Sequence, residues 1–129
     1  MDKPLLLING RFLTQSITGV QRYATEMVLA LSRLRCQYRF LVVAPKGKLV
    51  GAVPYTVQDT FPLNGHAWEQ IRLPWLIKKF KAKILWCPCN LSPVIKVVPL
   101  IVTIHDAAIF AGPEWFSGTF RLFYKIIMI

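Results

Sequence analysis

"PLLLINGRFLTQSITGVQRYATEMVLALSR" (residues 4–33) decides the fold class of this chain. A short apolar run, 4–9, comes first, and a polar turn separates it from a segment with helical periodicity. In residues 19–35, apolar side chains recur at the i, i+3, i+4 and i+7 spacing that gathers them on one face of a helix. That face consists of Val20, Tyr23, Ala24, Met27, Val28, Leu31 and Leu34. The stretch therefore predicts a buried β-strand followed by an amphipathic helix.

The same alternation of strand and helix continues along the chain. Four further apolar runs predict strands, at residues 38–45, 55–58, 84–88 and 100–105. Helices are predicted at 66–80, bent or begun afresh at Pro74, and from Ser117 onward. The stronger apolar runs are continuous, which is typical of strands buried on both faces of a parallel sheet. We therefore predict an α/β fold, a Rossmann-like parallel sheet with helices on both faces.

Length and composition indicate one domain, residues 1–129. Although 54% of the residues are hydrophobic, no window supplies the ~20 apolar residues of a membrane-spanning helix. The first residues do not match a secretory signal, because their apolar run is short and an acid precedes it. An odd number of cysteines, Cys36, Cys87 and Cys89, then predicts reduced thiols in a cytoplasmic protein. One residue separates Cys87 from Cys89, which does not match zinc spacing, so no metal is expected.

The net charge of +10 favours anionic partners, namely nucleic acid, acidic lipid surfaces or phosphorylated small molecules. Residues 77–83, "IKKFKAK", are a basic run that fits a solvated helix end. The alternative is a helix lying on a membrane surface. Its apolar side would consist of Trp68, Leu73, Trp75, Leu76 and Phe80. No nucleic acid is expected as a partner, because the chain carries no recognisable signature of a nucleic-acid-binding fold.

The turn before the first helix is the first candidate site. Thr18 and Gln21 match a capping box, and Gly19 is then the first helical residue. This turn follows the first strand, and open α/β sheets bind ligands at the carboxyl ends of their strands. A helix N-terminus without a side chain in the way offers N–H groups to an anion. A plain capped turn is the alternative, since a single glycine is neither a dinucleotide fingerprint nor a P-loop.

Two other strands end in polar residues at the same edge. His105 and Asp106 follow the fifth strand, where a histidine can donate to a sugar hydroxyl or carry a proton. Asp106 can orient that imidazole, while a loop histidine and a capping aspartate are the alternatives. Asn90 follows the fourth strand and either binds a polar ligand or serves the turn. No nucleophilic triad is expected, because no serine or cysteine accompanies the histidine.

Four stretches, taken together and in this order, resemble a known enzyme family. They are "INGRFLTQSITGVQRYATEMVLAL" (8–31), "GHAWEQIRLPWL" (65–76), "LWCPCNLSPV" (85–94) and "VTIHDAAIFAGPEWFS" (102–117). They are similar to the N-terminal domain of bacterial glycosyltransferases of family four, and more narrowly to mannosyltransferase-like members that build cell-surface polysaccharides. The similarity runs from Leu5 to about Tyr124.

The resemblance implies a two-domain enzyme whose N-terminal half mostly holds the acceptor. By analogy, Thr18 and Gly19 approach the donor pyrophosphate. His105 lies near the transferred sugar and Asp106 sets its loop. Arg22 and Asn90 line the cleft on the acceptor side. The implied reaction is metal-independent transfer with retention at the anomeric carbon, and the nucleotide-sugar is a substrate, so no cofactor is expected.

The second, donor-binding domain of that family has no counterpart in these 129 residues. We therefore expect the chain to be a fragment that is inactive alone, since its apolar helical pattern still runs at Ile129. The expected function is transfer of a hexose, with mannose a candidate, to a polysaccharide or lipid-linked acceptor. The expected location is the cytoplasm, with peripheral contact to the inner membrane as an option. The alternative function is a non-catalytic basic module that binds anionic membrane surfaces or nucleic acid.

Overall fold

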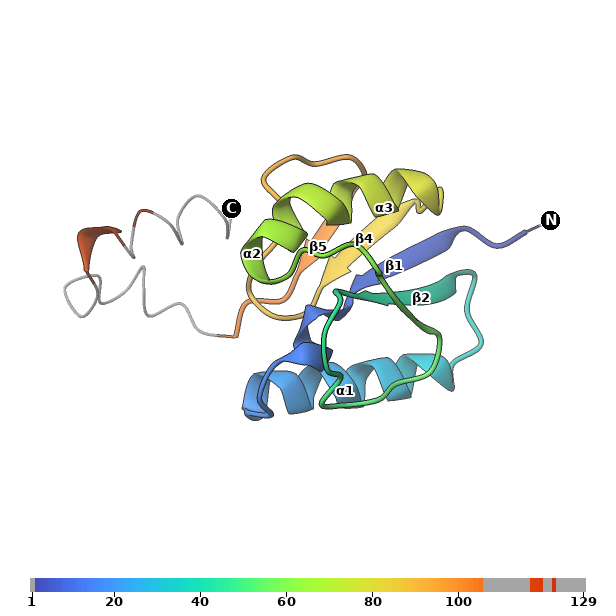
Figure 1. Ribbon diagram of the computed structural model, residues 1–129. Helices are drawn as coiled ribbons and strands as arrows, with labels where there is room; N and C mark the ends of the chain where they lie inside the picture. Colours follow the sequence, from blue (N-terminus) through green and yellow to red (C-terminus); the bar gives the residue numbers. More distant parts are fainter. Residues whose placement is uncertain (1, 106–116, 120–121, 123–129) are drawn as a thin grey trace.

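The computed structural model describes residues 2–105, 117–119 and 122 of the chain (Figure 1). Asp106 and most of the helix predicted from Ser117 lie outside these residues.

Within the described residues, the architecture is a five-stranded parallel sheet with the strand order β3-β2-β1-β4-β5. The strands are β1 (Leu5–Asn9), β2 (Arg39–Ala44), β3 (Thr56–Gln58), β4 (Ile84–Cys87) and β5 (Leu100–Val102). Each of the five predicted strands is confirmed, although β5 ends three residues before the predicted end. In the central register, Leu7 of β1 pairs with Leu41 of β2 and with Leu85 of β4.

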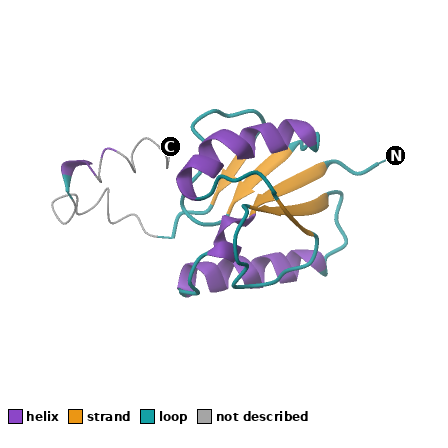
Figure 2. Ribbon diagram, viewed as in Figure 1, coloured by secondary structure: helices purple, strands orange, loops and turns teal. Residues whose placement is uncertain are grey.

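Helices cover both faces of this sheet, as predicted (Figure 2). Helix α1 (Gly19–Ser32) follows a 3-10 helix, η1 (Gly10–Thr14), and packs on one face. The opposite face is covered by α2 (Gly65–Ala67), the π-helical segment η2 (Trp68–Arg72) and α3 (Leu73–Lys79). These three form a continuous helical path. Its irregular part is the π-helical segment η2, which ends shortly before Pro74, a residue that has no backbone N–H to donate to the preceding turn.

Two apolar layers explain why β1 reads "LLLI" without alternation. Leu5 and Leu7 are buried in the layer beneath α3, whereas Leu6 and Ile8 are buried in the layer beneath α1. Successive side chains of a strand point to opposite faces, so a strand covered on both sides is apolar at every position.

Two expectations about helix faces were wrong. Met27 and Leu34 were both expected on the buried face, but Met27 is 36% exposed, and Leu34 is exposed because α1 ends at Ser32, before the predicted end. The second wrong expectation is that the helix at 66–80 turns an apolar side to a membrane. Three residues of that side, Trp68, Leu73 and Leu76, are buried against the sheet. None of the described helices is long and apolar enough to cross a membrane.

Candidate functional site

A polar cavity of about 220 Å³ lies at the carboxyl edge of the sheet. It is bounded by the end of β1, the start of α1, the helical path through η2 and the loop after β4. Its polar lining consists of Asn9, Arg11, Gln15, Thr18, Gln21, His66, Glu69 and Asn90. Because the strands are parallel, their carboxyl ends bring together residues that lie far apart in sequence.

Glu69 is the centre of this cluster, with only 3% of its surface exposed. Its Oε2 accepts a hydrogen bond from Asn9 Nδ2 at 2.7 Å, and its Oε1 lies 2.9 Å from Arg11 Nη1. Asn9 Oδ1 also accepts the backbone N–H of Arg11 at 3.2 Å, which fixes the first turn of η1. A buried carboxylate needs such partners, and here a guanidinium and an amide supply them.

His66 lies beside the same carboxylate, with Nδ1 3.5 Å from Glu69 Oε1. Burial is the main cause that lowers the pKa of His66, and the charge of Arg11 acts in the same direction. The carboxylate of Glu69 opposes both effects. The imidazole is therefore mainly neutral at neutral pH, and it can donate or accept a hydrogen bond.

The cysteines near the cavity are thiols rather than thiolates. Burial raises the pKa of Cys89 to about 12, and it raises the pKa of Cys87 as well. Only the thiolate is strongly nucleophilic, so neither side chain is activated at neutral pH. Within the described part of the chain, no group of three or more His, Cys, Asp or Glu side chains could hold a metal ion.

The start of α1 forms one wall of the cavity. The predicted capping box is present, and Gln21 Oε1 accepts the backbone N–H of Thr18 at 3.0 Å. Gly19 is exposed, and a Cβ atom added to it would meet nothing within 4 Å. The fold therefore does not require glycine there, and the open space leaves the helix N-terminus accessible to a ligand.

His105 lies at the predicted edge of the sheet, but its ring contacts other protein groups and does not line the cavity. Its Nε2 lies 2.6 Å from the carbonyl oxygen of Pro88, and its ring packs edge-on against Tyr23. The backbone N–H of His105 donates to Asn90 Oδ1 at 2.6 Å. Asn90 lines the cavity, but it also joins β4 to β5, since its own N–H donates to the carbonyl of Thr103.

Three of the six predicted site residues lie in or beside the polar cavity, two lie elsewhere, and one lies outside the described residues. Thr18 and Asn90 line the polar cavity, and Gly19 adjoins it. Arg22 is exposed and lines a separate hollow of about 210 Å³. His105 is not part of the cavity lining, and Asp106 lies outside the described residues.

Sequence reasoning missed the four residues that form the cluster: Asn9, Arg11, His66 and Glu69. One signal was available, because Glu69 lies four and seven residues before two apolar positions, Leu73 and Leu76. A carboxylate on the apolar face of a helix is rarely buried without a partner. Its partner Arg11 could not be chosen from sequence, because several other arginines were equally available.

A second ion pair anchors the helical path that carries Glu69. Arg72 contacts both carboxylate oxygens of Asp59, at 2.9 and 3.0 Å, and Trp68 Nε1 donates to Asp59 Oδ2 at 3.1 Å. The hydrogen bonds from Arg72 are the main cause that lowers the pKa of Asp59, and burial opposes them. The Arg72 guanidinium also lies over the rings of Phe61 and Trp75. This network holds η2 against the end of β3.

The arrangement suits hydrogen bonding to a ligand rich in hydroxyl or phosphate groups. Amides, a guanidinium, a carboxylate and a neutral imidazole offer donors and acceptors within one small cavity. Comparison of the chain with protein-family models, with curated proteins and with solved structures gives no match.

Proposed function

We propose that this chain is the acceptor-side domain of a retaining glycosyltransferase. The reaction is transfer of a hexose, with mannose a candidate, from a nucleotide-sugar to a polysaccharide or lipid-linked acceptor. The domain works together with a second, donor-binding domain, and the 129 residues alone are inactive. The proposed location is the cytoplasm.

The observation that carries the proposal is the cavity at the carboxyl edge of the sheet. It places the open N-terminus of α1, at Thr18 and Gly19, next to the cluster of Asn9, Arg11 and Glu69. A helix N-terminus suits a diphosphate, and the neighbouring amide and carboxylate groups suit sugar hydroxyls. The resemblance to family-four glycosyltransferases implies the first of these features, the approach of Thr18 and Gly19 to a donor diphosphate, whereas the cluster is an observation of the structure alone.

In this proposal the described residues bind and orient the substrates. Thr18 and Gly19 face the donor diphosphate, and Asn90 contributes to the acceptor side. The contacts of His105 with Pro88 and Tyr23 favour a positioning role, in which it holds the loop after β5. Arg22 and Asp106 remain candidates from the resemblance alone.

Binding to the isolated chain tests the proposal. Isotope-labelled protein is titrated with GDP-mannose, UDP-glucose and a mannose disaccharide while its amide NMR signals are followed. We expect shifts at Arg11, Thr18 and Gln21 for at least one of these compounds. Because the cavity walls carry few charges, we expect the affinity to be weak.

Two arginine variants make the test specific. Arg11→Gln keeps a donor for Glu69 but removes the cationic fork, and it should weaken binding. Arg35→Gln makes the same change at an exposed position beyond the C-terminal end of α1, outside the cavity lining, and should leave binding unchanged. Shifts that avoid the cavity, equal losses in both variants, or no shift with any compound would each overturn the proposal.

A further inference from the structure

The edge of the sheet opposite the cavity carries a concentration of positive charge. All strands begin at this amino edge, and α1 and α3 end there because they run against the strands. Its exposed basic residues are Lys3, Arg33, Arg35, Arg39, Lys78, Lys79, Lys81 and Lys83. They are half of the sixteen Lys and Arg residues of the chain. We call this region the amino-edge surface.

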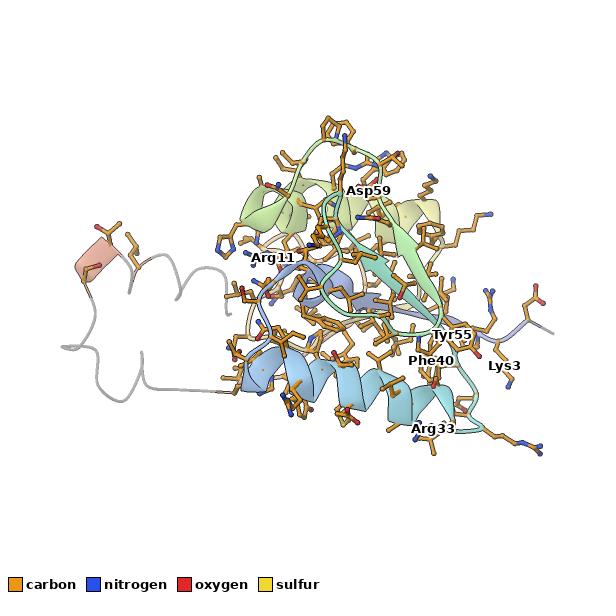
Figure 3. All side chains as sticks on the ribbon, turned by 60° about the horizontal axis from the view of Figure 1, so that its bottom comes forward. Lys3, Arg11, Arg33, Phe40, Tyr55 and Asp59 are labelled. Carbon is orange, nitrogen blue, oxygen red and sulfur yellow. The ribbon has the colours of Figure 1, made fainter. Side chains whose placement is uncertain are left out.

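Apolar and aromatic side chains stand among these charges. A groove of about 510 Å³ opens at the amino-edge surface, and its lining includes Leu34, Tyr38, Phe40, Tyr55 and Phe80. The exposed fraction is 61% for Leu34 and 60% for Tyr55. Figure 3 shows Lys3, Arg33, Phe40 and Tyr55 gathered at one end of the molecule, away from Arg11.

Local contacts fix parts of this surface in place. Arg39 Nε donates to the backbone carbonyl of Lys3 at 3.0 Å, which ties the starts of β1 and β2 together. Tyr55 has a φ of 60°, a left-handed conformation that aromatic residues adopt only rarely. The backbone N–H of Val42 donates to the carbonyl of Tyr55 at 2.8 Å, which secures this turn.

We propose that the amino-edge surface docks on a membrane that contains anionic lipids. Exposed lysines and arginines complement lipid phosphates, and each contributes to binding near a charged surface. Tyrosine and leucine side chains insert at the boundary between headgroups and acyl chains. A nucleic-acid backbone would match the charges but would leave Leu34 and the apolar groove without a partner.

This inference goes beyond the proposed function and does not depend on it. The amino-edge surface and the polar cavity lie at opposite ends of the parallel strands, and they share no lining residue. Either proposal can therefore fail while the other stands.

Vesicle binding by two double-lysine variants tests the electrostatic contribution to membrane docking. At physiological salt, the chain should bind vesicles in which about a third of the lipid is phosphatidylglycerol, and not vesicles of phosphatidylcholine alone. Lys3→Glu with Lys83→Glu should weaken that binding at least about tenfold. Lys46→Glu with Lys48→Glu makes the same change of net charge at exposed sites beyond the other end of β2, and should weaken it less than about twofold.

A pair of polar substitutions tests the contribution of the apolar side chains to membrane docking. Leu34→Asn with Tyr55→Asn should weaken vesicle binding several-fold, and asparagine tolerates the left-handed φ at position 55. Ile71→Asn with Ile95→Asn removes two equally exposed apolar residues elsewhere and should have no effect. Far-UV circular dichroism confirms that each variant is folded.

Several results would overturn the proposal. They are equal binding to neutral and anionic vesicles, equal losses from the two lysine pairs, and no loss from Leu34→Asn with Tyr55→Asn. Duplex DNA serves as the competing ligand at the same salt. Tighter binding of DNA than of vesicles, lost in the Lys3 and Lys83 variant alone, would make this a nucleic-acid surface instead.

Discussion

Glu69 Oε1 lies 2.9 Å from Arg11 Nη1 across the carboxyl edge of the sheet, although 58 residues separate them in sequence. The contact joins the turn after β1 to the helical path on the opposite face from α1. It therefore stabilises the fold and shapes the candidate site at once. Glu69 is buried and Arg11 is partly buried, so the pair is costly to break from one side, because the remaining charge loses its partner.

Neutralising Glu69 should destabilise the protein. We expect Glu69→Gln to lower the free energy of unfolding by about 3 kcal/mol, since Arg11 and Asn9 lose their anionic acceptor. Urea denaturation measures this change. Glu26→Gln, at an exposed position of α1, is the matched control and should alter stability by less than about 0.5 kcal/mol.

The same variant should also change the titration of His66. Glu69 raises the pKa of His66 in the native protein, while burial and Arg11 lower it. Removing the carboxylate should therefore lower that pKa further, as measured by NMR of the imidazole. An unchanged or higher pKa in Glu69→Gln would contradict the electrostatic description of the cavity.

Two glycines at the site should differ sharply in their tolerance of a methyl group. A Cβ atom at Gly10 would lie 2.6 Å from the carbonyl oxygen of Val43, whereas one at Gly19 would meet nothing within 4 Å. Gly10→Ala should cost about 2 kcal/mol or more, because backbone of β2 must shift. Gly19→Ala should be neutral or slightly stabilising. Thermal unfolding compares the two, and equal costs would refute the close approach at Gly10.

Asp59 should make stability fall in acid. Hydrogen bonds from Arg72 lower the pKa of Asp59 in the folded protein below its ordinary value near 3.8. A lowered carboxyl pKa stabilises the fold above the unfolded-state value, and this stabilisation is lost as the pH falls through the folded-state value. The stability difference between the wild type and Asp59→Asn should thus be largest at neutral pH and shrink below about pH 4. A constant difference from pH 7 to pH 2 would show that ionisation of Asp59 is not the cause.

His105 should contribute to stability through its ring. His105→Ala should cost about 1 to 2 kcal/mol, because it removes the hydrogen bond to Pro88 and the edge contact with Tyr23. His105→Phe keeps the ring contact and should recover part of that loss. If neither variant is destabilised while ligand binding falls, His105 acts on the ligand directly.

An exposed apolar strip should limit solubility. Tyr23, Met27 and Ile101 line a hollow beside α1, and Ile101 is 51% exposed on β5, the last strand of the sheet in the described region. Exposed apolar edges favour association between copies. Met27→Lys with Ile101→Thr should raise the monomer fraction in size-exclusion chromatography. Ile71→Lys with Ile95→Thr, at other exposed positions, should raise it less.

The strand positions were predictable, whereas the helix faces were only partly so. Apolar runs such as "LLLI" mark strands that are covered on both sides, and the five predicted strands are present. Periodicity alone could not say where α1 ends, so Leu34 was assigned to a face it does not share. It also could not distinguish a core face from a membrane face, so Trp68 and Leu73 were offered as surface residues although both are buried.

By itself, the sequence determined the parallel α/β fold and the edge at which polar residues would gather. That follows from local physics, because hydrophobic periodicity selects strand or helix, and the alternation of these elements selects parallel pairing. Only the tertiary structure decided which polar residues share the cavity. Contacts such as those of Glu69 with Arg11 and of His105 with Pro88 depend on how strands and helices pack across the sheet. Many partners were possible from sequence for Glu69 and for His105, and the packing of the folded chain selected Arg11 and Pro88.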